Sequence, residues 1–321
     1  MSARRTLARL LTLFAFAAWF EAASPATTTA QVPAFLGSWG GSGGGFGQFN
    51  GPYGIAIDSQ NRVIVVDDGN DRVQLFDRVG TALTIWGGIG TTPGRFSYPT
   101  GVALHGDLVY VMDTSNQRVQ VFNTNFEFIR EWGSYGTGAG LFDYPVGIAV
   151  SPDGKVYIAD TGNDRIQVFS PDGTFLMSWG GLVRPEGIAI DRSGRVYVTD
   201  PFNNRVRMFT AQGALIRQWG SLGTGRGTFH DPTGVAIDLQ GRVLVVDYFN
   251  HRIQVFTDQG VYLTQWGGSP GVGALISPVR IAVANDGEIY VTDLSNQVFQ
   301  FGTLPTSTVR TTWTALKARF R

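Results

Sequence analysis

Cysteine is absent from the 321 residues. Its absence excludes disulfides, thiolate metal ligands and a cysteine nucleophile. Charged residues are scarce, at 16%, while hydrophobic residues make up 43%, and a chain of this length and composition can bury a large core. The 43 glycines are nearly twice the usual share and follow no Gly-X-Y period, so they indicate many tight turns rather than collagen.

The first thirty residues differ in composition from the rest. Arginines precede an apolar run over residues 10–20, and small residues follow it through Ala30. This layout is typical of a secretory signal, and the run is shorter than the ~20 residues that a membrane-spanning helix needs. Cleavage after Ala26 or Ala30 would fit. We therefore expect residues 1–30 to be a signal peptide and short linker, no transmembrane segment after cleavage, and a secreted or periplasmic protein.

Charge is unevenly distributed along the chain. Without residues 1–26 and without the basic residues of the segment 303–321, the body carries 18 basic and 24 acidic side chains. This acidic balance disfavours nucleic acid as a partner. The segment 303–321 is expected to be a basic C-terminal tail, in which Trp313, Leu316 and Phe320 are spaced as on a short helix. Docking on the body, contact with anionic lipid and a loose chain all stay open for this tail.

Internal repetition dominates the remaining sequence. The dipeptide Trp-Gly occurs six times, at Trp39, Trp86, Trp132, Trp179, Trp219 and Trp266. A second pattern, D-x-x-N-x-R, begins at Asp67, Asp113, Asp160, Asp200 and Asp247, and a sixth copy at Asp293 has Val298 where the arginine is expected. Each unit holds four short segments rich in β-branched and aromatic residues, separated by turn pairs such as Asp-Gly. The sequence therefore predicts an all-β, six-bladed β-propeller of four-stranded blades.

These repeats resemble the NHL-repeat family over residues 35–301. The resemblance rests on Pro-x-Gly, Asp-x-x-Asn-x-Arg and a following strand such as RVQLF, RVQVF or RIQVF, all in register. It implies a toroidal propeller, expected over residues 31–302, of a kind that often serves as a sensor or interaction module. RNA binding is known for some relatives, but the acidic body and the export signal disfavour it here.

The order of the repeats predicts how the ring closes. The first Trp-Gly has no repeat before it, and the last repeat, 278–301, has no Trp-Gly after it. We expect residues 34–39 to supply the outer strand of the last blade, which would remove both open sheet edges. Trp313, which follows Trp266 by one repeat length but lacks the glycine, is the alternative.

Residues common to every blade are expected to be structural, and residues unique to one blade are the candidates for a site. The Asp, Asn and Arg of the repeated motif are expected to bond to backbone N–H groups and to carboxylates at the turn. The tryptophans are expected to pack between blades.

The unique residues gather in the loops predicted to reach one face of the ring. Inside Pro-x-Gly the residue varies, and Tyr53, Glu186 and Arg280 are the distinctive members of this loop. The connection from Trp179 to Pro185 spans 6 residues where the others span 12 or 13, which predicts a notch in the rim. Arg184, Glu186, Phe202, Tyr248 and Phe249 are expected near it, as an aromatic and charged patch that binds a protein, peptide or glycan. The aromatic residues could instead fold over the blades as covers.

Two enzyme classes with similar architecture provide the alternative. Amidating lyases hold zinc through histidines, but His105, His230 and His251 occupy unlike repeat positions. Propeller lactonases hold calcium on the axis, and here only Glu186 suits a hard cation, so it is a weak candidate metal ligand. We therefore predict no cofactor and no catalytic residue, a monomer, and a binding function, with a metal-dependent hydrolase or lyase at the channel mouth as the alternative.

Overall fold

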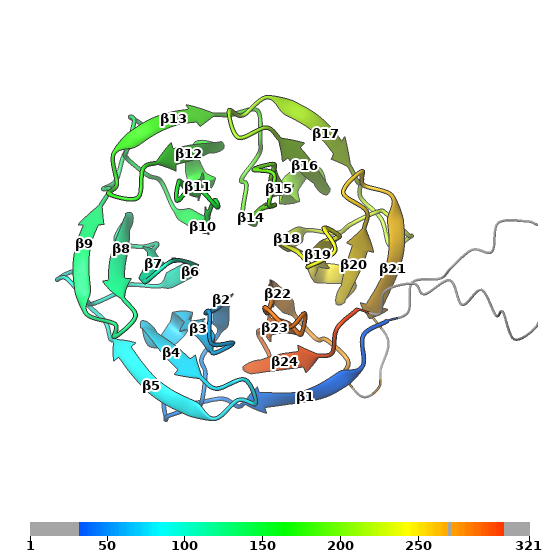
Figure 1. Ribbon diagram of the computed structural model, residues 1–321, viewed down its shortest axis with the longest axis horizontal. Coiled ribbons are helices and arrows are strands. Elements are labelled where there is room, and N and C mark those ends of the chain that lie inside the picture. The colour runs from blue at the N-terminus through cyan, green and yellow to red at the C-terminus, as the bar shows by residue number, and fades with distance from the viewer. Residues whose placement is uncertain (1–31, 269–270, 272, 305–321) are drawn as a thin grey trace, which may run out of the picture. The chain divides into compact units, whose positions relative to one another are not determined.

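The computed structural model describes residues 32–268, 271 and 273–304. They form six four-stranded antiparallel sheets arranged around an axis, so the predicted six-bladed propeller is confirmed (Figure 1). The expected signal peptide and most of the expected tail, including Trp313, lie outside the described residues. Within those residues no helix is long and apolar enough to cross a membrane.

Each blade runs from an inner strand beside the axis to an outer strand at the periphery. Blades one to three comprise β2 (Pro52–Ile57), β3 (Val63–Asp67), β4 (Arg72–Phe76) and β5 (Ala82–Gly87); β6 (Pro99–His105), β7 (Leu108–Asp113), β8 (Arg118–Asn123) and β9 (Phe128–Trp132); β10 (Pro145–Val150), β11 (Val156–Asp160), β12 (Arg165–Phe169) and β13 (Phe175–Trp179). Blades four to six comprise β14 (Ile188–Ile190), β15 (Val196–Asp200), β16 (Arg205–Phe209) and β17 (Leu215–Trp219); β18 (Pro232–Ile237), β19 (Val243–Asp247), β20 (Arg252–Phe256) and β21 (Tyr262–Gly267); β22 (Pro278–Val283), β23 (Ile289–Asp293), β24 (Gln297–Phe301) and β1 (Phe35–Gly40). Short 3-10 helices follow the second strand of four blades: η1 (Asp68–Asn70), η2 (Thr161–Asn163), η3 (Pro201–Asn203) and η4 (Tyr248–Asn250).

The ring closes through its first strand, as predicted. β1 pairs antiparallel with β24, with Trp39 opposite Val298, so the two ends of the propeller share blade six (Figure 1). This pairing leaves neither end of the ring with an open edge, and it couples the start of the propeller to its end.

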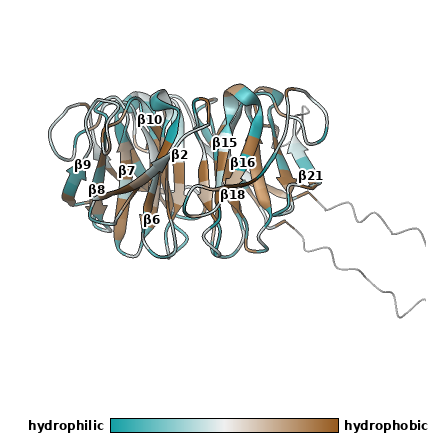
Figure 2. Cartoon of the chain, turned by 90° about the horizontal axis from the view of Figure 1, so that it is seen from above, coloured by the Kyte–Doolittle hydropathy of each residue, from teal (hydrophilic) through white to brown (hydrophobic). Residues whose placement is uncertain are grey.

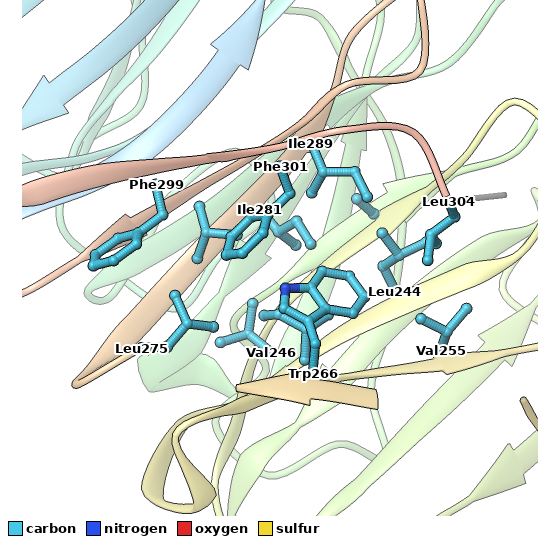
Figure 3. Packing of buried hydrophobic residues seen from close by; sticks show 13 residues of the cluster. Leu244, Val246, Val255, Trp266, Leu275, Ile281, Ile289, Phe299, Phe301 and Leu304 are labelled. Atoms are coloured by element: carbon cyan, nitrogen blue, oxygen red, sulfur yellow. The ribbon is translucent and has the colours of Figure 1, made fainter. Parts of the chain in front are cut away.

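The core lies in the seams between neighbouring blades. Figure 3 shows the seam between blades five and six, where Trp266 of β21 contacts Phe301 of β24 with ring centroids 5.7 Å apart. The same arrangement recurs elsewhere: Trp132 of blade two contacts Phe169 of blade three at 5.9 Å. The outer-strand tryptophans therefore pack between blades, as expected, and they contribute apolar area that fixes each blade against the next.

The repeated Asp forms the polar centre of each blade. Asp67 is fully buried and accepts hydrogen bonds from the backbone N–H of Asn50 (2.7 Å), the Asn70 amide (2.9 Å) and the Arg72 Nε (2.7 Å). The same three kinds of bond recur in blades two to five. The structural role predicted for the motif is confirmed, because a buried carboxylate is retained only when it is paired and hydrogen-bonded.

One expectation for the sixth motif is wrong. Counting along the sequence places Val298 at the arginine position, but strand register places Gln297 there, because Gln297 pairs with Asp293 as Arg72 pairs with Asp67. The turn in blade six is one residue shorter than the others, so counting from the Asp is displaced by one position.

The same shortening changes the role of Asn296. Its backbone is left-handed, with φ 65°, and its side-chain oxygen accepts a hydrogen bond from the N–H of Gly51 in blade one (2.8 Å). In blade one this role belongs to Asp71, the residue after the motif Asn, which has φ 52° and accepts from the N–H of Tyr98 (2.8 Å). Asn296 therefore does not act as the motif Asn. Its side chain instead forms a hydrogen bond that links blade six to blade one.

Candidate functional site

The candidate site lies on the face that carries two sets of connections: the loops before the inner strands and the turns between second and third strands. We call it the channel-mouth face; Figure 2 shows the ring from the side, with connections above and below the strands. Exposed large aromatic side chains of the described residues gather in these connections: Phe46, Tyr98, Tyr135, Tyr144, Phe202 and Phe249. The seventh, Phe128, lies on the outer strand β9. Among the large hydrophobic side chains of the described residues, the turns of the opposite face expose only aliphatic ones, namely Val79, Leu239 and Val261.

The residues immediately before the inner-strand prolines form a rim around the channel mouth. Tyr98, Tyr144, Arg184 and Asp231 all have left-handed backbone there, with φ of 46°, 48°, 50° and 61°. That conformation is costly for bulky residues and persists only where the surroundings impose it. A side chain of the preceding blade imposes it by accepting the backbone N–H, as at Tyr144 (2.7 Å) and Asp231 (3.0 Å).

Inside this rim, side chains from three blades meet. Tyr53 of β2 donates its hydroxyl to Glu186 (3.3 Å), and Arg280 of β22 pairs with the same Glu186 oxygen (3.3 Å). The Arg280 guanidinium also lies over the Tyr53 ring, 4.6 Å from its centroid. Glu186 thus forms an ion pair with Arg280. Because blades one and four are opposite each other, this cluster bridges the channel mouth (Figure 1).

Burial keeps the phenol of Tyr53 protonated. Burial is the main cause that raises the pKa of Tyr53, with Glu186 adding to it, so the phenol stays neutral and remains a donor. Burial, then Glu186, also raises the pKa of Asp231 on the rim. Below the cluster, an axial cavity of about 60 Å³ is lined by inner-strand residues of all six blades, among them Ile55, Val102 and Arg280. The cavity on the axis is thus narrow.

The connection between blades three and four is shorter than its counterparts, as predicted. It runs from Gly180 to Gly187, and it leads into an inner strand, β14, of only 3 residues. Arg184 is an exposed residue of this connection, and its guanidinium carbon Cζ lies 5.4 Å from the ring centroid of Phe202. The structure therefore brings two of the predicted notch residues together.

The remaining predicted aromatic residues form a separate group. Phe249 contacts Tyr248 and His230, with both pairs of ring centroids 4.8 Å apart, and Phe249 is 51% exposed. The predicted patch is therefore three groups on one face: the Tyr53 cluster, the Arg184–Phe202 pair and the Phe249 group. No hydrogen bond, ion pair, ring contact or cation–π contact among the described residues joins the last two.

The histidines lie apart. His105 lies at the end of β6 on the opposite face, where it lines a polar cavity of about 700 Å³ with Asp58, Asp107 and others. His230 and His251 lie on the channel-mouth face. In the part of the chain that the structure describes, no group of three His, Cys, Asp or Glu residues is arranged to hold a metal ion.

Sequence reasoning missed part of this site. Tyr98, Tyr144 and Asp231 were not predicted, although the residue before each inner-strand proline varies as much as the residue after it. That variation was the available signal. Asp68 was also missed; its Oδ1 is buried without a hydrogen-bond partner among the described residues.

The family assignment follows from the repeats. A profile of the NHL repeat matches residues 96–122, 142–169, 182–209 and 229–256, which are blades two to five. The ring supplies the two remaining blades with the same strand order. The chain is an NHL-repeat β-propeller.

Solved structures of low sequence identity share the fold of this NHL propeller. Virginiamycin B lyase from Staphylococcus aureus matches with a TM-score of 0.58 at 15% identity, over 79% of this chain and 95% of that one. A gluconolactonase from Xanthomonas campestris matches with a TM-score of 0.62 at 16% identity, over 81% and 88%. Hydrazine synthase from Kuenenia stuttgartiensis matches with a TM-score of 0.56 at 14% identity, over 80% and 97%. At these identities the likeness concerns the fold alone.

Proposed function

We propose that this chain is an exported, monomeric binding platform that captures a protein, peptide or glycan ligand on its channel-mouth face. The observation that carries the proposal is the one-sided distribution of exposed aromatic side chains. Six of the seven such residues among those described lie in the connections of that face. Aromatic anchors dominate binding energies because they bury much area at a small entropic cost.

The strained rim supports the same function. Tyr98 and Tyr144 are 57% and 48% exposed, yet each is held in a left-handed backbone conformation by the preceding blade. A fold that maintains bulky exposed residues in this conformation presents them in fixed directions. Fixed aromatic side chains lose little entropy on binding, which favours affinity.

The alternative is a lyase or lactonase with its site at the channel mouth. Such a site would need Glu186 for a cation or a substrate, and here Glu186 is bonded to Arg280 and Tyr53. An ion pair that bridges the mouth competes with a cation for the same carboxylate. We therefore favour binding above the bridged mouth over chemistry within it.

A screen of the propeller over residues 31–304 on glycan and random-peptide arrays tests the binding function. The Tyr98→Ala/Tyr144→Ala variant should lose roughly tenfold in affinity for the ligands found, as expected when anchor aromatics are truncated. A matched variant, Val79→Ser/Leu239→Ser, changes exposed apolar residues of the opposite face and should bind unchanged. Equal losses in both variants would contradict the proposed face.

Calcium tests the alternative. Thermal unfolding of the same protein with and without Ca²⁺, beside a Glu186→Ala variant, should show no Ca²⁺-dependent shift in either. A stabilisation by Ca²⁺ that disappears in the variant would instead support the lactonase-like function, since a ligand that binds only the native state raises the unfolding temperature.

A further inference from the structure

In most blades, the backbone carbonyls of the loop before the inner strand accept hydrogen bonds from the Asn and Arg side chains of the blade's own motif. In blade three, the Arg165 guanidinium donates to the carbonyls of Thr137 (2.7 Å), Gly138 (2.7 Å) and Leu141 (2.9 Å). Asn163 donates to the carbonyl of Gly136 (2.9 Å). The arginines and asparagines of blades one, two and five make equivalent bonds to their loops. Four blades therefore show how these donors are satisfied.

Blade four has the same Arg and Asn donors, but its loop before the inner strand is too short to supply the carbonyl acceptors. Arg205 donates its Nε to Asp200 (2.8 Å), and across the described residues its two terminal nitrogens have no hydrogen bond. Asn203 likewise bonds only to Asp200 within that part of the chain. The Arg205 side chain is 24% exposed, so its unpaired nitrogens can reach a ligand.

A substitution beside these donors changes their chemistry. In blade three, Gln167 accepts the N–H of Gly140 (2.9 Å) and donates to the carbonyl of Leu141 (2.6 Å). Blade four has Arg207 at this position, which can only donate. Its Nη1 donates to the carbonyl of Gly181, while its Nε is buried without a partner in the described residues.

Two guanidinium groups thus lie close together where blades one, two, three and five have one guanidinium and a neutral amide. Burial, followed by the charge of Arg205, lowers the pKa of Arg207. A ligand oxygen with negative charge would accept from the terminal nitrogens of Arg205 and reduce this repulsion, whereas a neutral carbonyl would only accept hydrogen bonds. A carboxylate is therefore the better complement.

We propose that the short loop of blade four is a docking position for a peptide segment of a partner protein, whose Asp or Glu carboxylate binds Arg205 and Arg207. The segment takes the place of the loop that the other blades supply from their own chain. Phe202, 65% exposed beside Arg184, lies within the motif of blade four, between Asp200 and Asn203, and offers an apolar contact for the same segment. The inference rests on the proposed function and specifies its ligand as an acidic peptide segment.

An array of random 12-residue peptides tests the proposal. Binding of the propeller over residues 31–304 to each peptide is measured. Bound peptides should be enriched in Asp and Glu. The Arg207→Gln variant carries the residue found in blades one, two, three and five, so it should fold; its affinity for the acidic peptides should fall roughly tenfold, the loss of one charge-assisted bond. A filled variant, in which the sequence of residues 134–141 replaces Gly181 in the Arg207→Gln background, should lose binding.

The controls separate this proposal from the general one. Arg217→Gln removes an exposed charge from the outer strand of the same blade and should leave the binding unchanged. Glycans or peptides that depend on Tyr98 and Tyr144 but bind equally to the filled variant would preserve the binding platform and overturn the docking position. Peptides without enrichment in Asp and Glu, or the absence of any bound peptide, would overturn it as well.

Discussion

Blades three and four contain the same motif and differ in what surrounds it. In blade three, Asp160 accepts four hydrogen bonds, and the Arg165 guanidinium is saturated by its loop. In blade four, Asp200 lacks the fourth donor, and Arg205 faces solvent with its outer nitrogens. The comparison teaches that the repeated residues maintain the blade in both cases, whereas a missing loop converts structural donors into donors available for a ligand.

Removing the carboxylate at the centre of each blade gives the largest expected effect. Asp160→Ala should lower the free energy of unfolding by about 3–5 kcal/mol, because it leaves the partly buried Arg165 charge without its carboxylate and its Nε without an acceptor. Asp200→Ala should cost less, because water can solvate the Arg205 guanidinium, whose side chain is 24% exposed against 17% for Arg165. Urea unfolding of both variants measures the difference. A larger loss for Asp200→Ala would contradict the comparison.

The fold could be predicted in detail because the Trp-Gly dipeptide and the D-x-x-N-x-R motif recur from blade to blade. Six tryptophans, six buried aspartates and the unmatched ends specified the blades, the seams and the closure through β1. The error at Gln297 arose because counting along a chain does not detect a turn shortened by one residue, whereas strand register does.

The site was predictable only in part. Glu186 and Arg280 differ from their counterparts in sequence, so their pairing could be expected. Tyr98 and Tyr144 owe their conformation to acceptors on the preceding blade, and a contact between distant segments leaves no local pattern. The unpaired donors of Arg205 likewise follow from a loop that is missing, which only comparison with the other blades reveals.

A second comparison, between blades one and three, predicts a pH dependence. Thr161 donates its hydroxyl to the carbonyl of Pro185 in the next blade (2.7 Å). Blade one has Asp68 at this position, with a buried, unpaired oxygen. Burial, with Asp71 and Asp67 adding to it, raises the pKa of Asp68 from 3.8 to about 7. Folding therefore favours the protonated carboxyl, which can donate as threonine does.

The sign of the effect follows from this raised pKa. Between pH 4 and 7 the native state binds more protons than the unfolded state, so the stability contributed by Asp68 falls as the pH rises. The loss should reach about 2 kcal/mol, less than the full shift implies because part of the carboxyl reaches water. Urea unfolding of the parent and of Asp68→Thr across this range measures it: the variant should be the more stable protein at pH 8. Parallel pH profiles would refute the role of Asp68.

The smallest expected effect concerns the ion pair at the mouth, compared with the pairs inside the blades. Glu186 is 23% exposed and lies 3.3 Å from Arg280, whereas Asp160 is fully buried and lies 2.7 Å from Arg165. Solvent screening weakens the first pair far more than the second. A double-mutant cycle of Glu186→Gln with Arg280→Gln should give a coupling of about 1 kcal/mol that decreases in 1 M salt. A coupling that resists salt would mean that the mouth is held as firmly as a blade, and the ligand would then meet a rigid surface rather than an adjustable one.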